Sequence, residues 1–197
     1  ETIEDINPAT SEVIATIPRS NSNDVNEAVL AADKARDNWS SLSLDERRKW
    51  LEKIANALEA RSEEIAKLES LDTGKPIKIA RAVDASRSVA NFRFFAEFSK
   101  DFHEQKFLME DATNHVIFKP VGIAGLITPW NLPLYLLSWK IAPAIVMGNT
   151  VVAKPSELTP LTANLLAEVF DEVGLPAGVV NIVCLLYTSD AADDLWC

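Results

Sequence analysis

The last third of the chain alternates short apolar runs with helix-like segments, and this alternation limits the possible folds more than any other sequence feature. Residues 121–128, VGIAGLIT, form a continuous apolar run typical of strands that are buried on both faces. The pattern continues as helix, strand, helix and strand, at about 133–147, 150–154, 159–174 and 179–183. Thr159 is the expected N-cap of the second helix, with Pro160 at its first position. The β-α-β-α-β order predicts an α/β fold with a parallel sheet and right-handed crossovers.

The first hundred residues are predicted to be mostly helical. A turn-forming NPAT begins residues 7–18, which indicate the turn and second strand of a hairpin. Ser43 and Glu46 have capping-box spacing, and DTGKP at residues 72–76 contains the glycine and proline that end a helix. Three helices are therefore expected, at about 23–38, 43–71 and 77–102.

Residues 107–120, FLMEDATNHVIFKP, are predicted to form two short strands around a turn at 111–114. His103 and His115 lie in or beside this hairpin and lack the spacing of metal ligands. No Cys/His cluster occurs in the sequence, so we expect no metal site.

Charge and cysteine content narrow the classes of partner. The chain has 19 Lys and Arg against 29 Asp and Glu, a net charge of −10, which argues against nucleic-acid binding. Residues 132–148 are the most apolar stretch, but they fall short of the roughly 20 residues of a membrane span, so we expect no membrane partner. Cys184 and Cys197 lie near the end and support no disulfide framework, which favours the cytoplasm.

Two loops follow the first two predicted strands of the sheet, where open α/β sheets bind ligands. In TPWNLP, the Asn131 amide could donate to a developing oxyanion, or Asn131 could merely cap the helix that follows. In KPSE, Lys154 and Glu157 could hold ribose hydroxyls, or they could be solvated charges at a strand end. No GxGxxG occurs, so a nucleotide site here must be built in another way.

Taken together and in order, these motifs resemble the NAD(P)-dependent aldehyde dehydrogenase superfamily over about residues 7–183. They are NPAT, the Trp39 region, DTGKP, the stretch from VGIAGLITPWN to KPSELTPLTA, and GLPAGVVNIV. One departure is Ser11, where the family usually has glycine. The resemblance implies a partial Rossmann-like parallel sheet with an N-terminal helical region and a β-hairpin for oligomerisation. The expected parts are 1–106 (hairpin and helices), 107–120 (oligomerisation hairpin) and 121–183 (βαβαβ part of the NAD-binding domain), from a homo-oligomeric parent.

The resemblance also assigns roles by position. Asn131 looks like the oxyanion-hole asparagine, and Lys154 and Glu157 look like the residues that hold the adenosine ribose. A carboxylate at Glu157 would repel a 2′-phosphate, so we expect NAD rather than NADP as cofactor. Further residues expected to line the cofactor cleft are Ile127, Thr128, Pro129, Trp130 and Ser156.

The substrate is expected to be a small-molecule aldehyde. Family position places Leu132, Leu136 and Trp139 in a substrate tunnel, although they could also be one apolar helix face. RSVANFRFFAEF and PWNLPLYLLSWKIAPA look like the branch that acts on 2-aminomuconic or 2-hydroxymuconic semialdehyde. These substrates carry a carboxylate, for which Arg87 is the first candidate partner and Arg93 the second, unless both are solvated helix arginines.

Residues 184–197 match no part of the family pattern, because the expected glycine-rich loop is replaced by CLLYTSDAADDLWC. We expect this tail to be non-native and the chain to be an N-terminal fragment. The family's catalytic cysteine and glutamate come from later sequence, so the chain as given is expected to be inactive. The alternatives are a non-catalytic nucleotide-binding or interaction module, and a generic α/β domain without activity.

Overall fold

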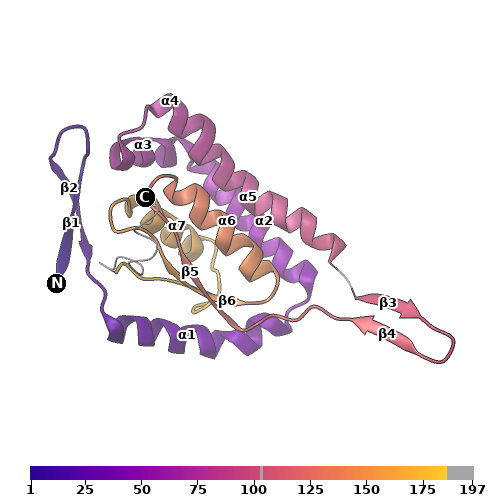
Figure 1. The fold of residues 1–197 in the computed structure, drawn as a ribbon. Coiled ribbons are helices and arrows are strands. Elements are labelled where there is room, and N and C mark those ends of the chain that lie inside the picture. The colour runs from indigo at the N-terminus through magenta and orange to yellow at the C-terminus, as the bar shows by residue number, and fades with distance from the viewer. Residues whose placement is uncertain (103, 186–197) are drawn as a thin grey trace, which may run out of the picture.

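The computed structural model describes residues 1–102 and 104–185 (Figure 1). Its centre is a parallel sheet in the order β5-β6-β7, formed by Ile123–Ile127, Thr150–Lys154 and Val180–Ile182. The connecting helices are α6 (Pro133–Val146) and α7 (Leu161–Glu172). The predicted β-α-β-α-β unit is therefore confirmed. The expectations for His103, Cys197 and the tail beyond residue 185 lie outside the described residues.

The sheet is covered by helices on both faces (Figure 1). Both crossovers step in the same direction along the sheet, which puts α6 and α7 on one face. The other face is covered by α1 (Ser22–Ser41). Two long-range hydrogen bonds fix α1 in place: Trp39 Nε1 donates to Ile145 O at 2.9 Å, and Thr150 Oγ1 donates to Ala32 O at 3.0 Å.

Close packing of α1 also explains the glycine before β7. Gly178 has a φ of +86°, and a Cβ on it would lie 2.4 Å from Ala31 O. Only glycine therefore fits between α1 and the strand.

The strand β5 differs from the expectation of burial on both faces. It lies at the edge of the sheet, and Ile127 at its end is 56% exposed. Among the described residues no strand pairs with its outer edge, so its side chains are only partly covered.

The helical region contains more breaks than the sequence pattern indicated. The expected long helix is two helices, α2 (Leu44–Ala60) and α3 (Ser62–Thr73), which meet at Arg61. The break is compensated by ion pairs of the Arg61 guanidinium with Glu64 and Glu168, both at 2.7 Å. The predicted capping box of α2 is confirmed. The first helix starts slightly earlier than predicted, because Asn21 caps it.

The third helical pattern is a composite. It consists of α4 (Ile77–Ile79), a π-helical segment (Ala80–Ala85), α5 (Ser86–Phe98) and a 3₁₀ turn (Ser99–Asp101). Gly74, in the left-handed conformation with φ 73°, separates it from α3, as the DTGKP motif predicted.

Two antiparallel hairpins lie outside the sheet (Figure 1). The N-terminal one pairs β1 (Thr2–Ile6) with β2 (Val13–Pro18). The second pairs β3 (Gln105–Leu108) with β4 (Thr113–Val116), and all eight strand residues are exposed. Its turn at 109–112 comes two residues earlier than predicted, because Leu108 pairs with Thr113 and Met109 N donates to Ala112 O.

The start of α7 corrects another sequence prediction. Thr159 is not the N-cap; its hydroxyl donates to Trp130 O at 3.4 Å. Instead, the Leu161 N–H donates to Asp72 Oδ2 at 3.0 Å. A buried carboxylate from α3 thus takes the place of a local capping side chain.

No helix in the described part of the chain is both long and apolar enough to cross a membrane. Within the same residues, no three His, Cys, Asp or Glu side chains are grouped as they would be around a metal ion.

The N-terminal hairpin contributes a second buried acid next to Asp72. Asp5 on β1 is 2% exposed and Asp72 is 3% exposed. Burial, together with the neighbouring Asp5 charge, raises the pKa of Asp72 to about 8. The pKa of Asp5 is also raised, mainly by burial.

This pair should make the stability of the fold fall as pH rises. In the unfolded chain Asp72 loses its proton near pH 4, but in the folded chain it keeps it until about pH 8. The contribution of Asp72 to the free energy of unfolding is therefore complete below pH 4 and is lost as the pH rises through 8. This free energy falls by at most about 1.4 kcal/mol per pH unit. Thermal melts between pH 5 and 8.5 should show a clearly smaller decline for Asp72→Asn than for the unmodified protein. The exposed neighbour Glu4, changed to Gln, is the control, and an equal decline in Asp72→Asn would contradict this account.

Candidate functional site

The parallel pairing of β5 with β6 brings the two predicted functional loops together. Ile127 and Lys154 are paired at the carboxyl ends of these strands, and Thr128 N donates to Lys154 O at 3.1 Å. The bond from Thr159 to Trp130 O joins the loops a second time. The residues after β5 and those after β6 thus form one continuous surface at this edge of the sheet.

Lys154 and Glu157 form a partly buried ion pair on this surface. Lys154 Nζ lies 2.8 Å from Glu157 Oε2, and their side chains are only 12% and 15% exposed. They are therefore not the solvated charges of the alternative interpretation. Both hold fixed positions at the end of β6, where they could bind neighbouring hydroxyl groups.

The other residues predicted to line a cofactor cleft divide into exposed and buried members. Ile127, Pro129 and Trp130 are exposed, and Trp130 shows 58% of its surface. Thr128 and Ser156 are buried. The Ser156 hydroxyl accepts from Leu158 N, whereas the Thr128 hydroxyl has no partner among the described residues. This hydroxyl is therefore a buried polar group without a hydrogen-bond partner among the described residues, just after β5.

Asn131 lies on the exposed turn between β5 and α6. The helix N-cap is Leu132, and no side chain of the turn bonds back to the helix. The Leu134 N–H donates at 3.1 Å to Glu69 Oε1 instead. The interpretation of Asn131 as a helix cap is therefore wrong, and its side-chain amide bonds to no other described residue.

A buried cluster of charges beneath this turn was missed by the sequence analysis. Lys75 Nζ lies 2.9 Å from Asp84 Oδ1 and 3.6 Å from Glu69 Oε2, and it donates to Asn131 O at 3.3 Å. Glu69 and Asp84 are fully buried. Burial, and then the charge of Asp84, raises the pKa of Glu69. The available signal was Glu69 itself, because it stands four residues after the apolar Ile65 on the inner face of α3.

Lys140 is a second cation that the sequence analysis missed. It extends from α6, and its Nζ donates to Ile127 O at 2.6 Å. The ammonium thus lies at the carboxyl end of β5, next to the loop that carries Asn131.

Of the predicted tunnel residues, Leu132 precedes α6 as its N-cap, and Leu136 and Trp139 lie outside the buried face of that helix. Leu132 and Leu136 are half-buried, and Trp139 is 47% exposed, with its ring 5.5 Å from that of Tyr135. The buried face consists of other residues: Pro133, Leu134, Leu137, Ser138, Ile141, Ala142, Ile145 and Val146. The three predicted positions therefore do not form the apolar face that packs into the core.

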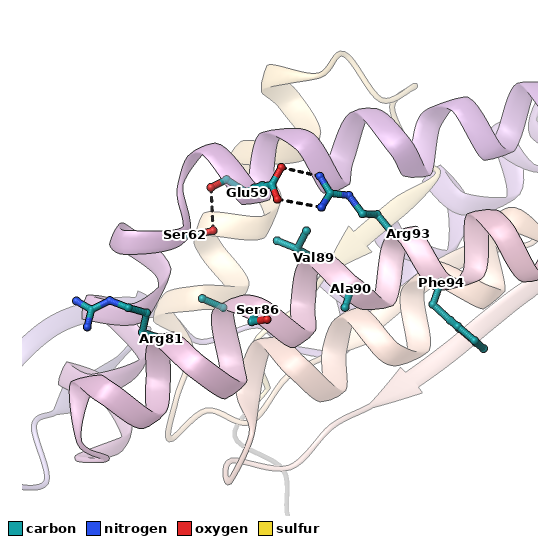
Figure 2. Close-up of a pocket in the computed structure, with 9 residues that line it drawn as sticks. Glu59, Ser62, Arg81, Ser86, Val89, Ala90, Arg93 and Phe94 are labelled. Atoms are coloured by element: carbon teal, nitrogen blue, oxygen red, sulfur yellow. Dashed lines mark hydrogen bonds and ion pairs between the residues drawn. The ribbon is translucent and has the colours of Figure 1, made fainter.

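The two candidate arginines on α5 have different surroundings. Arg93 faces α2, where it pairs with both oxygens of Glu59 at 2.6 and 2.9 Å (Figure 2). It lines a groove of about 700 Å³ between these helices, which contains none of the other predicted site residues. Arg87 is exposed and has no ion pair with another described residue.

The contacts of α5 with α6 place Arg87 on the side of the predicted site. Asp84 reaches Lys75 beneath the Asn131 turn, and Asn91 Nδ2 donates to Tyr135 O at 3.0 Å. Arg87 stands four residues before Asn91 on α5, so it neighbours Asn91 at the border of the side that faces α6. This geometry favours Arg87 over Arg93.

The chain is similar to known proteins over almost its whole length. The family model described as "Aldehyde dehydrogenase family" matches residues 1–195, a range that includes most of residues 184–197; the non-native origin of that tail stays a prediction. The chain is 51% identical over 184 residues to 2-aminomuconic semialdehyde dehydrogenase of Danio rerio, covering 92% of this chain and 38% of that protein. It is 44% identical over 188 residues to 2-hydroxymuconic semialdehyde dehydrogenase of Pseudomonas sp. (strain CF600), covering 92% and 39%.

The fold also matches solved structures of aldehyde dehydrogenases. The NAD+ complex structure of aldehyde dehydrogenase from Bacillus cereus superposes with a TM-score of 0.91 at 39% identity, covering 94% of this chain and 38% of that one. The chain therefore spans less than two fifths of the length of these relatives.

Proposed function

Because this chain belongs to the aldehyde dehydrogenase family, we propose that it is part of an NAD-dependent enzyme that oxidises an aldehyde to a carboxylic acid. The observation that carries the proposal is the position of Asn131. The side-chain amide of Asn131 makes no hydrogen bond to another described residue. The loop that carries Asn131 lies next to the loop of the Lys154–Glu157 ion pair, because β5 pairs with β6. A hydrogen-bond donor for the developing oxyanion and an ion pair that holds the nucleotide would thus lie on one surface.

The residues at the end of β6 fit a dinucleotide. Lys154 and Glu157 would hold the adenosine ribose, and the buried Thr128 would support the cleft wall at the end of β5. Ile127, Pro129, Trp130 and Ser156 would line the cleft around them. NAD, when bound, accepts the hydride from the substrate. The similar Bacillus cereus aldehyde dehydrogenase was solved as an NAD+ complex, which supports the assignment.

Asn131 would act on the aldehyde itself. When a nucleophile adds to the carbonyl carbon, negative charge develops on the aldehyde oxygen, and a fixed amide N–H at that point stabilises it. No rearrangement of hydrogen bonds would be needed, because the Asn131 amide bonds to no described residue.

The nucleophile itself would come from outside the described residues. Cys184 is half-buried beside the Lys154–Glu157 pair, and its thiol pKa is raised, mainly by burial and then by the charge of Glu157. A thiol with a raised pKa is a poor nucleophile at neutral pH. We therefore assign the attack on the aldehyde, and the activation of water, to groups of the full-length protein.

The substrate would be a semialdehyde that carries a carboxylate. Arg87 is an exposed guanidinium without an ion pair among the described residues, and it neighbours Asn91 at the border of the α6-facing side of α5. Leu132, Leu136 and Trp139 would line the path between Arg87 and Asn131. The name of the Danio rerio relative, 2-aminomuconic semialdehyde dehydrogenase, fits such a substrate.

The β3–β4 hairpin would serve assembly of a homo-oligomer, since all its strand residues are exposed and its edges are available for pairing. Cys184 forms no disulfide with another described residue, which fits a reducing compartment such as the cytoplasm.

The catalytic proposal is tested with a full-length protein that contains this chain. Asn131→Ala should lower the turnover number with a carboxylated aldehyde by about 10² to 10³, because one oxyanion donor is lost. Its dissociation constant for NAD, from isothermal titration, should stay within about twofold. If the unmodified protein binds NAD but forms no NADH from any aldehyde, the alternative of a non-catalytic nucleotide-binding module is correct.

Cofactor preference should depend on Glu157. In the same protein, Glu157→Gln removes the charge that would repel a 2′-phosphate, while an amide can still accept from a ribose hydroxyl. The ratio of kcat/KM for NAD to that for NADP should fall by at least about tenfold. The exposed Glu172→Gln is a matched control. An unchanged ratio in Glu157→Gln would refute the ribose assignment.

Substrate choice should depend on Arg87 more than on Arg93. Arg87→Ala should raise the KM of a carboxylated semialdehyde about tenfold or more, because a charge-assisted pair is lost. The KM of an uncharged aldehyde should stay the same. Arg93→Ala serves as the matched control on the same helix. Equal KM effects of the two variants on the carboxylated substrate would count against Arg87.

A further inference from the structure

We propose that Lys75 is a positioning residue for the oxyanion donor Asn131, an inference that rests on the proposed function. The side chains that Lys75 contacts, those of Asp84 and Glu69, are buried and would not touch the substrate. The Lys75 ammonium also donates to the main-chain carbonyl of Asn131 at 3.3 Å. It would act by fixing the peptide from which the Asn131 amide projects.

The main chain around Lys75 is itself well fixed. It follows Gly74, which ends α3 in the left-handed conformation, and it precedes Pro76, which restricts its backbone to extended geometry. The Ser70 hydroxyl donates to Lys75 O at 2.7 Å. The Lys75 side chain is only 15% exposed. With its backbone restrained and its side chain mostly buried, the ammonium has few alternative positions.

Two buried carboxylates hold the ammonium. Asp84 lies in the π-helical segment, and one of its oxygens contacts Lys75 while the other has no partner among the described residues. A π-helical turn contains an extra residue and changes the direction in which a side chain points, and such turns are frequent at functional positions. Glu69 adds the second carboxylate at 3.6 Å.

Lys75 and Glu69 together bind both ends of one short turn. Lys75 donates to Asn131 O, and Glu69 accepts from the Leu134 N–H. Glu69 also accepts from Thr162 Oγ1 at 2.9 Å, which ties the turn to α7. All contacts to the turn are with its main chain, so the Asn131 side chain stays available while its backbone is held. Displacement of such a group by about 1 Å can cost about 10² in rate.

The charges around Lys75 limit which substitutions can test its positioning role. One ammonium faces two buried carboxylates, so Lys75→Met alone would leave like charges buried together and could unfold the protein. Lys75→Met combined with Asp84→Asn removes one charge of each sign. This charge-balanced pair separates positioning from stability.

The test is a double-mutant cycle in a full-length protein that contains this chain, measured as the single-turnover rate of NADH formation. The charge-balanced pair should lower this rate about 10- to 100-fold, with the KM for NAD within about twofold. In an Asn131→Ala background the same pair should cause no further loss, because Lys75 acts only through Asn131. Lys78→Met, an exposed lysine three residues away, is the control and should leave the rate unchanged.

Two results would overturn the proposal. One is an unchanged rate in the charge-balanced pair, and the other is an equal fold loss in the presence and absence of Asn131. If the pair variant melts below the assay temperature, the same cycle is run with Asp84→Asn alone, which loosens Lys75 without removing it. Activity of the unmodified protein tests the proposed function separately, so the two ideas can fail independently.

Discussion

The parallel pairing of β5 with β6 is the constraint on which the candidate site depends. Because Ile127 and Lys154 are in register, both strands end at the same edge of the sheet, and the loops that follow are joined by two further hydrogen bonds. A shift of one residue would turn every side chain of β6 to the other face. The anchoring of α1 through Trp39 and Thr150 holds this register from the opposite face.

Buried ionisable side chains at the end of α3 and just after it position the starts of α6 and α7. Asp72 caps α7, Glu69 caps α6, and Lys75 holds the turn before α6. Burial of such groups is costly, and each is compensated by a hydrogen bond to a main-chain group of a different element. The N-terminal helical region thus positions the loops of the sheet as well as packing against it.

Much of this arrangement could be predicted from local sequence. The alternation after residue 121 predicted the limits of β6 and the parallel β-α-β-α-β connectivity, and the Ser43–Glu46 spacing predicted the capping box of α2. The resemblance of the TPWN and KPSE loops led to a family that the comparisons confirm.

The features that the sequence did not predict correctly depend on contacts between residues far apart in the chain. Thr159 lost its expected role to Asp72 from α3, the break at Arg61 is supported by Glu168 from α7, and the Lys75 cluster joins three separate segments.

The central claim is that the surface joining the β5 and β6 loops is where the dinucleotide binds, next to Asn131. Hydrogen–deuterium exchange of a full-length protein that contains this chain, with and without NAD, tests it most directly. If the dinucleotide binds to this surface, NAD slows exchange in residues 127–131 and 154–159 together and leaves exchange in the groove between α2 and α5 unchanged. Slower exchange in that groove, without any change in the two loops, would contradict it.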